Sequence, residues 1–284
     1  MTQKFDKHLT VKSENITAID ILAEHTDFSR QKLKQIMKQG AVWLTQGQST
    51  RRIRRASKKL SPGQIVHLYY NEQILKETDY AAQLIADEGD YSVWFKPSGM
   101  LSQGTKYGDH SAIYRWAETH LQPERNAFLV HRLDRATSGL IIIAHSKKAA
   151  AALAELFSQR AINKYYKALV NGMLNAPVTI DKILDNKKAV TKILSAEPLD
   201  NEQYSLLDIQ LLTGRKHQIR QHLSSLGHPL VGDRLYGNEK KHNTDLCLTA
   251  YKIDFISPFD QQEKHYELKK SLQLFSISAQ ARLI

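Results

Sequence analysis

The chain has 284 residues, 42% of them hydrophobic, which excludes a wholly disordered protein and suffices for a medium-sized domain beside a small one. A single cysteine, Cys247, excludes an intrachain disulfide, and the longest aliphatic run is far too short to span a membrane. We therefore expect a soluble cytoplasmic protein without membrane association, and the net charge of +11 favours a polyanionic partner.

The positive charge is concentrated near the N-terminus. Residues 1–70 hold 13 Lys or Arg and 5 Asp or Glu, so 13 − 5 gives +8 there and leaves +3 for the other 214 residues. This quarter of the chain is therefore expected to be a separate electrostatic unit, and we predict a small domain over residues 1–75.

Short helices and strands are expected within this domain. Apolar residues at helical spacing from Ile16 predict a first helix, and Ser29 is suited to cap a second helix that ends at Gly40. Three features follow in order: a strand at 41–44, a turn at 46–47 before the basic run RRIRRASKK, and a strand at 65–70. This arrangement over residues 16–70 resembles the small RNA-binding domain named after ribosomal protein S-four.

The resemblance implies that basic side chains of this domain contact RNA. The expected contacts lie on the outer face of the second helix and in the basic run: Arg30, Lys34, Lys38, Arg51, Arg52, Arg54 and Arg55. The alternative is that these charges are only a solvated face, which is the more common outcome for a run of like charges. Their concentration in one compact unit favours RNA.

The larger domain is expected over residues 85–284, after a linker at 76–84 that has no clear period. Its predicted strands are 92–95, 127–130, 139–145, 166–170, 205–212 and 246–255, and its predicted helices are 146–159 and 217–226. Strands and helices do not alternate regularly, which argues against a parallel doubly wound sheet. We therefore predict an α+β fold, with a mixed, largely antiparallel sheet in the larger domain and a small α/β domain at the N-terminus.

A carboxylate flanked by arginines lies between two predicted strands. The segment HRLDRATSGL, residues 131–140, places Asp134 between Arg132 and Arg135, where it could serve as a nucleophile or a base. A purely structural ion pair between Asp134 and a neighbouring arginine would have the same sequence pattern. Spacing alone does not decide between these two interpretations.

Four motifs, in order along the chain, resemble those of the RluA family of RNA pseudouridine synthases. The HRLD and TSG sequences resemble the segment around the family's catalytic aspartate. The other three are KPSG at 96–99, NKYYKALVNG at 163–172, and LTGRKHQIRQH at 212–222 continuing into LGHPLVGDRLYG at 226–237. The resemblance covers residues 92–258. The sequence departs from the family pattern at Thr249, where relatives commonly have histidine. Thr249 is not one of the expected catalytic residues.

The resemblance implies that the protein isomerises uridine to pseudouridine in RNA. This reaction breaks the bond from uracil N1 to ribose C1′ and joins C5 to the same carbon, so no metal or redox cofactor is expected. Asp134 is then the expected nucleophile, either by adding to ribose C1′ or by helping to remove the 2′ proton. Tyr166 is expected to stack on the uracil and accept the C5 proton, and Arg215 to pair with the carboxylate.

The remaining site residues are expected to bind RNA. Arg132 would fill the space left by a flipped-out uridine, and Lys96, His217 and Arg220 are weaker candidates for phosphate contacts. His217 and His222 are five residues apart on the expected helix, and no cluster of Cys, Asp or Glu completes a metal-ligand spacing, so no metal is expected.

Two other functions stay open at this point. One is a nucleosidase acting on RNA, which would release free uracil, and the other is a non-catalytic RNA-binding factor. For a pseudouridine synthase, the family resemblance allows ribosomal or transfer RNA, and the N-terminal domain favours ribosomal RNA. The protein is expected to be monomeric.

Overall fold

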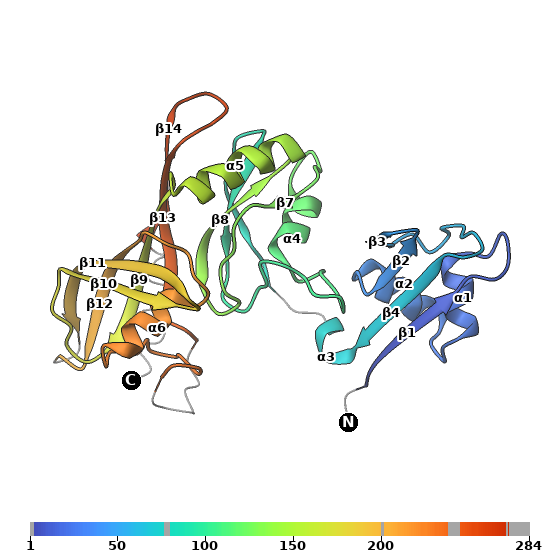
Figure 1. The fold of residues 1–284 in the computed structure, drawn as a ribbon, viewed down its shortest axis with the longest axis horizontal. Helices are drawn as coiled ribbons and strands as arrows, with labels where there is room; N and C mark the ends of the chain where they lie inside the picture. Colours follow the sequence, from blue (N-terminus) through green and yellow to red (C-terminus); the bar gives the residue numbers. More distant parts are fainter. Residues whose placement is uncertain (1–2, 77–79, 200–201, 238–244, 271, 273–284) are drawn as a thin grey trace. The chain divides into compact units, whose positions relative to one another are not determined.

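The structure, a computed structural model, describes residues 3–76, 80–199, 202–237, 245–270 and 272. The chain divides into two compact units (Figure 1). Unit 1 comprises Met1–Asp79 and Gln103–Trp116, and unit 2 comprises Tyr80–Ser102 and Ala117–Ile284. The expected division into 1–75 and 85–284 therefore differs from the units in one main respect, because residues 103–116 belong to unit 1.

Unit 1 is built on a four-stranded antiparallel sheet. The strand order is β1 (Lys4–Thr10), β4 (Ile65–Asn71), β2 (Val42–Gln46) and β3 (Ser49–Arg52). Its helices are α1 (Ala18–Glu24), α2 (Arg30–Lys38) and the single turn α3 (Glu72–Leu75). Alternate strand residues such as Val66 and Leu68 share one buried core with Leu22, Leu33 and Ile36 of α1 and α2, so one face of the sheet packs against these helices.

Most of the elements predicted for unit 1 are confirmed. Ser29 caps α2, because its Oγ accepts the backbone N–H of Lys32 at 3.2 Å. The strand β1 was not predicted, since only Phe5 and Leu9 of Lys4–Thr10 are apolar, and this alternation is too short to stand out. The resemblance to the S-four domain stays a prediction.

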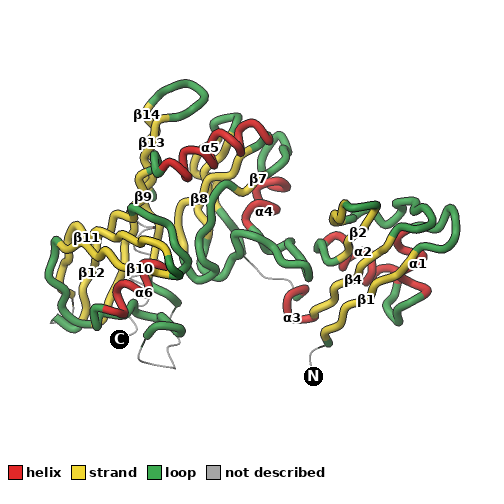
Figure 2. Tube along the Cα trace, in the orientation of Figure 1, coloured by secondary structure: helices red, strands yellow, loops and turns green. Residues whose placement is uncertain are grey.

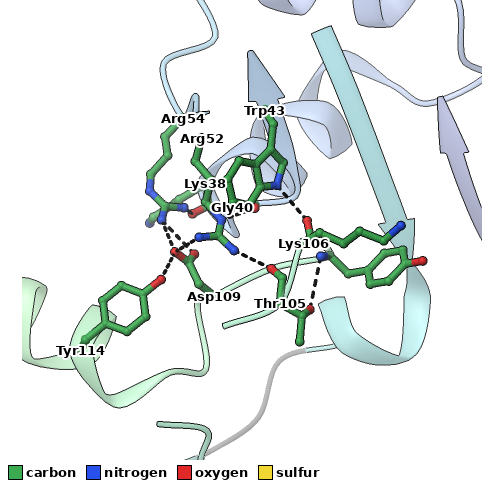
Figure 3. Close-up of polar contacts among 10 residues, drawn as sticks. Lys38, Gly40, Trp43, Arg52, Arg54, Thr105, Lys106, Asp109 and Tyr114 are labelled. Carbon is green, nitrogen blue, oxygen red and sulfur yellow. Dashed lines mark hydrogen bonds and ion pairs between the residues drawn. The ribbon is translucent and has the colours of Figure 1, made fainter. Parts of the chain in front are cut away.

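Residues 103–116, which we call the strap, are held to the rest of unit 1 by the buried carboxylate of Asp109 (Figure 3). A single nitrogen of Arg54 donates to both Asp109 oxygens, at 2.8 and 2.6 Å, and the Tyr114 hydroxyl donates at 2.5 Å. Gly40 is left-handed at φ +83°, and a Cβ on it would lie only 2.2 Å from Asp109 Oδ1. A glycine is therefore required where the carboxylate approaches the backbone.

Arg52 and Arg54, two of the predicted RNA contacts, hold the strap (Figure 3). The Arg52 guanidinium donates to the carbonyl oxygens of Gly40 and Thr105, at 2.9 and 2.5 Å, and lies 4.2 Å above the Trp43 ring. Arg54 is occupied by Asp109. Both arginines have partners within unit 1, so the basic run has fewer unpaired cations than its sequence indicates.

Unit 2 is built on a ten-stranded sheet (Figure 2). The strand order is β10 (Val178–Leu184), β11 (Lys187–Leu199), β12 (Tyr204–Leu211), β9 (Asn163–Asn171), β13 (Leu248–Ile256), β8 (Ser138–Ala144), β6 (Tyr91–Lys96) and β5 (Gln83–Asp87), with β14 (Glu263–Glu267) paired to β13 and β7 (Phe128–Leu129) paired to β8. The described pairings are antiparallel except that of β8 with β13, which confirms the predicted mixed, largely antiparallel sheet.

Two of the described helices pack against this sheet. Helix α5 (Lys147–Gln159) packs against β7 and β8, and α6 (Gln218–Ser225) packs against β10 and β11. Helix α4 (Ile113–His120) begins in the strap and ends in unit 2. None of the helices in the described ranges is long and apolar enough to cross a membrane.

The hairpin of β10 and β11 was not predicted. Both strands carry charged residues, and β11 contains Pro198, so neither has a clean alternation of apolar and polar residues. The signal that could have found them is the pair Asp185 and Asn186, which both have positive φ, 50° and 58°, as a two-residue hairpin turn requires.

The parallel pairing of β8 with β13 depends on the glycine of the TSG sequence. A Cβ on Gly139, at φ +122°, would lie 2.2 Å from the carbonyl oxygen of Ala250. Beside this contact the Ser138 hydroxyl lies 2.9 Å from that of Thr249, the residue that departs from the family pattern. Thr249 therefore completes a buried hydroxyl pair at the base of the segment that carries Asp134.

Candidate active site

A cleft of about 820 Å³ lies in unit 2, where three segments meet. They are the loop between β7 and β8, the junction of α5 with β9, and the connection from β12 into α6. Six residues singled out in the sequence line this cleft: Arg132, Asp134, Tyr166, Arg215, His217 and Arg220. Folding thus brings together side chains up to 88 positions apart (220 − 132).

Residues 96–102, which begin with the KPSG motif, hold the loop that carries Asp134. Ser102 Oγ donates to the carbonyl of Leu133 at 2.7 Å and accepts its N–H at 3.0 Å. The backbone N–H of Gly99 donates to the carbonyl of Arg135 at 2.8 Å. These bonds lie on both sides of Asp134, so its backbone is fixed while its side chain is left to the cleft.

Lys96 is not a phosphate contact. Its side chain is fully buried, and its ammonium donates to the carbonyls of Pro97, Met100 and Arg135 at 3.0, 2.9 and 3.4 Å. Burial lowers the pKa of Lys96 to about 7, although the charge of Asp134 opposes this change. The prediction is wrong because the lysine of the KPSG motif joins two loops instead of reaching solvent.

His131, at the start of the same loop, is a neutral structural residue. Its Nε2 accepts the backbone N–H of Ile142 at 2.8 Å, and its ring stacks on Phe157 with centroids 4.4 Å apart. Burial, and then the charge of Lys164, lowers the pKa of His131 to about 3. The uncharged ring can therefore be packed at the edge of the cleft.

Tyr166 lies on β9, and only 7% of its surface is exposed. Burial, and then the negative charge of Asp134, raises the pKa of the Tyr166 phenol well above its usual value. The hydroxyl is therefore protonated in the resting site. Tyr166 and Asp134 thus line the same cleft.

The expected ion pair between Arg215 and Asp134 is not formed in the described part of the chain. The Arg215 Nε donates instead to the carbonyl of Lys188 at 3.1 Å. Arg220, which was expected to bind phosphate, lines the same cleft, and the charge of Asp134 helps to raise the pKa of Arg220. Both arginines line the cleft, and spacing alone could not show that Arg215 bonds to the backbone of Lys188.

Arg220 is buried against a second carboxylate, Asp233. Its Nε and a terminal nitrogen donate to the two Asp233 oxygens at 2.8 and 2.6 Å, and the residues are 5% and 1% exposed. Burial opposes the charged form, but the hydrogen bonds and charge of Asp233, followed by the charge of Asp134, raise the pKa of Arg220. Arg220 is thus a permanent cation that cannot extend toward solvent. The sequence analysis did not single out Asp233, although this residue belongs to the last motif.

The His217 imidazole lies beside the Asp134 carboxylate. Its Nε2 lies 3.8 Å from Asp134 Oδ1, and its Nδ1 lies 3.0 Å from the hydroxyl of Tyr236. The residue precedes α6 in a left-handed conformation, φ 54° and ψ 25°, which costs roughly 1–3 kcal/mol for a residue other than glycine. Tyr236 was also missed by the sequence reasoning, although it belongs to the last motif.

Five further cations line the cleft without an ion pair to any carboxylate in the ranges that the structure describes: Arg132, Arg160, Lys164, Arg215 and Lys216. Arg160 and Lys164 were not singled out in the sequence. Burial, and then the charge of Arg160, lowers the pKa of Lys164. Asp134 is the single carboxylate among the described lining residues, so this wall is short of negative charge. Such a wall suits an anionic ligand.

The other predicted RNA contacts belong to unit 1. Lys34, Lys38, Arg51 and Arg55 are exposed, and Arg30 forms an ion pair with Asp20 at 2.7 Å. The described residues of the whole chain contain no group of three or more His, Cys, Asp or Glu that could hold a metal ion.

Comparisons with a family model and with known proteins point to the same family. A family model described as RNA pseudouridylate synthase matches residues 90–225. The tRNA pseudouridine synthase C of Vibrio vulnificus is 31% identical over 202 residues, which are 59% of this chain and 82% of the relative. The ribosomal large subunit pseudouridine synthase D of Zymomonas mobilis is 28% identical over 283 residues, 88% of this chain and 89% of the relative.

A solved structure shares the fold. Human RNA pseudouridylate synthase domain containing 1 aligns with a TM-score of 0.58 and 22% identity, over 71% of this chain and 89% of that one.

Proposed function

Because the chain belongs to the RNA pseudouridine synthase family, we propose that it isomerises specific uridines of a structured RNA, with Asp134 attacking a flipped-out nucleotide. The observation that carries this proposal is the cleft in which Asp134, Tyr166 and Arg220 come together. Asp134 is the single carboxylate among the described residues that line it.

The charges of the cleft support RNA as the ligand. A nucleotide brings phosphates, and the five lining cations without a carboxylate partner can neutralise them. Arg132 is exposed on this wall, and we propose that its planar guanidinium enters the space left by the flipped base.

Asp134 begins the reaction in this proposal. Its side chain is 27% exposed, so substrate can reach it, and Arg220 lines the same cleft. Arg220 takes the role that the sequence assigned to Arg215. Since Arg220 is itself held by Asp233, the carboxylate faces a cation of fixed position.

Tyr166 is proposed to stack on the uracil and to accept the C5 proton. Its raised pKa means that it starts protonated, and one cause is the charge of Asp134. Formation of a covalent bond by the carboxylate would remove this charge and bring the pKa of Tyr166 closer to its ordinary value. Because the phenol is protonated, it would act as a relay, passing its own hydroxyl proton to water as it takes the proton from C5.

Ribosomal RNA is the favoured substrate. The relative named for the large ribosomal subunit aligns over 88% of this chain, whereas the relative named for tRNA aligns over 59%. The longer alignment must therefore include part of unit 1, for which we propose RNA contacts through Arg30, Lys34, Lys38, Arg51 and Arg55. The monomeric state and the cytoplasmic location stay predictions.

Mapping of pseudouridines in total RNA tests the proposal. Cells that lack the gene should lose one or a few positions, which the parent gene restores and a gene encoding Asp134→Asn does not. Purified protein incubated with the identified RNA should form pseudouridine without release of uracil. Release of free uracil would instead show a nucleosidase, and an unchanged map would favour a non-catalytic RNA-binding factor.

A further inference from the structure

A chain of polar contacts leads away from the Asp134 carboxylate into the last motif. Asp134 Oδ1 lies 3.8 Å from His217 Nε2, and His217 Nδ1 lies 3.0 Å from the hydroxyl of Tyr236. The two rings also meet edge to face, with centroids 5.7 Å apart and an angle of 73° between their planes. The imidazole is therefore held on the side opposite to the carboxylate.

Tyr236 is in turn fixed by the buried pair of Arg220 and Asp233. Its backbone N–H donates to Asp233 Oδ1 at 3.1 Å, and the Arg220 guanidinium lies 5.2 Å from the centre of its ring. The carboxylate, the imidazole and the phenol thus belong to one network with the cation that acts on Asp134.

The hydrogen positions follow from electrostatics. If Nδ1 of His217 carried the hydrogen, the lone pair of Nε2 would face the Asp134 carboxylate, and the two would repel each other. If the Tyr236 hydroxyl donates to Nδ1, Nε2 carries the hydrogen and directs it at Asp134 Oδ1. The second arrangement satisfies both contacts with a neutral ring.

A neutral ring agrees with the groups that face it. Burial lowers the pKa of His217, and the carboxylates of Asp134 and Asp233, which raise it, are opposed by Arg220 and Lys216. A neutral imidazole can orient the carboxylate without adding a second full positive charge, which would weaken the nucleophile.

We propose that His217, oriented by the Tyr236 hydroxyl, is a positioning residue that aims the Asp134 carboxylate through its Nε2–H. The 3.8 Å separation is longer than a hydrogen bond, and it would shorten when the nucleotide fills the cleft. The left-handed backbone of His217 fits this role, because it turns the side chain toward Asp134 instead of leaving it as an ordinary cap of α6. The inference rests on the proposed function.

The main test is Tyr236→Phe, which removes the hydroxyl and keeps the ring. The single-turnover rate of pseudouridine formation at saturating RNA should fall about tenfold, the effect of removing one hydrogen bond, while the RNA concentration for half-maximal rate changes less than about twofold. Tyr204→Phe is the matched control, because Tyr204 lies at the far end of β12 and its hydroxyl has no hydrogen bond in the described structure. It should keep the parent rate.

A second pair of variants separates aiming from packing. His217→Gln places an amide N–H near the position of Nε2–H and should keep most of the rate, whereas His217→Leu should lose about tenfold or more. Neither residue is a glycine or an asparagine, so both variants have the same difficulty with the left-handed backbone. If Tyr236→Phe does not fold, this pair alone decides.

The outcomes distinguish the inference from the proposed function. A parent enzyme that forms no pseudouridine contradicts the proposed function itself. An active parent with an unaffected Tyr236→Phe variant overturns the inference alone. It is also overturned if the Tyr236→Phe loss lies wholly in the RNA concentration required, or if His217→Gln is as slow as His217→Leu.

Discussion

Each unit of the molecule buries an aspartate whose two oxygens receive hydrogen bonds from one arginine. In unit 1 Arg54 donates to Asp109, and in unit 2 Arg220 donates to Asp233, both at distances of 2.6 and 2.8 Å. The sequence predicted both arginines as RNA contacts. Instead, both arginines pair with a buried carboxylate, because a charge removed from water needs a counter-charge.

The difference between the pairs lies in what else each arginine faces. Arg220 also acts on Asp134 in the cleft, and its side chain is only 6% exposed. Arg54 is 27% exposed and shares Asp109 with Arg52 and Tyr114, so it holds the strap within unit 1. The same local chemistry therefore serves the reaction in one unit and the architecture in the other.

The largest expected effect is that of Asp134→Asn. Removal of the negative charge removes the nucleophile, and the single-turnover rate should fall at least about 10⁴-fold, the range seen when a catalytic nucleophile is removed. RNA affinity should stay within a few-fold, since it depends on phosphate contacts. The same substitution at Asp109 in unit 1 should leave the rate within about threefold, and equal losses at the two positions would contradict the division of roles.

Tyr166→Phe should slow the reaction by at least about a hundredfold, because stacking is kept while the group proposed to take the C5 proton is removed. Single-turnover measurement at saturating RNA isolates this step. Tyr114→Phe, which removes a hydroxyl from the Asp109 cluster, is the matched substitution in unit 1 and should keep the parent rate. A near-normal rate for Tyr166→Phe would remove Tyr166 from the role of base.

Substitution of each arginine by methionine compares the two pairs directly. Arg220→Met leaves Asp233 buried without its cation and should lower the free energy of unfolding by about 3–5 kcal/mol. Arg54→Met should cost only about 1–2 kcal/mol, since Arg52 and Tyr114 still face Asp109. Urea unfolding measures both, and a similar cost for the two variants would show that the pairs are equivalent.

The cost of Arg220→Met should depend on pH. Burial raises the pKa of Asp233, but its hydrogen bonds to Arg220 and to backbone N–H groups outweigh this and lower it. A lowered pKa in the folded state stabilises the protein above the unfolded value, about 3.9, and this stabilisation disappears as the pH falls through the folded pKa. The difference between parent and variant should therefore be full at pH 7 and shrink as the pH falls below about 4.

The smallest expected effect concerns the exposed cations of unit 1. Replacing Lys34 and Lys38 by alanine should reduce the slope of log affinity against log salt by up to about 1.4, because each single-strand phosphate that is no longer neutralised reduces it by about 0.7. An unchanged slope would show that this face of α2 does not touch RNA.

An enzyme without residues 1–75 should still isomerise uridine, with a shallower slope of log RNA affinity against log salt. The deletion also removes Arg52 and Arg54, the partners of Asp109. The point variants therefore separate RNA binding from release of the strap. Equal activity and thermal stability of the deletion and the point variants would show that the ion pairs of Asp109 are dispensable.

Local features of the chain were predictable where neighbours in sequence decide them. Ser29 caps its helix as predicted, the helix predicted at 146–159 is α5, and Asp134 was identified from the resemblance of its motif to the RluA family. The largely antiparallel sheet followed from the irregular order of helices and strands. The hairpin of β10 and β11 was missed because its strands are too polar on both faces for an apolar alternation to show.

The sequence by itself determined which residue types could supply the chemistry and, through their motif order, which family they belong to. Only the tertiary structure decided which cations are free to act. Lys96 binds three carbonyls, Arg54 meets Asp109 from 55 positions away, and Arg220 is held by Asp233. The physical reason is that a charged side chain is assigned by its burial and its counter-charge, and both depend on segments far apart in the sequence.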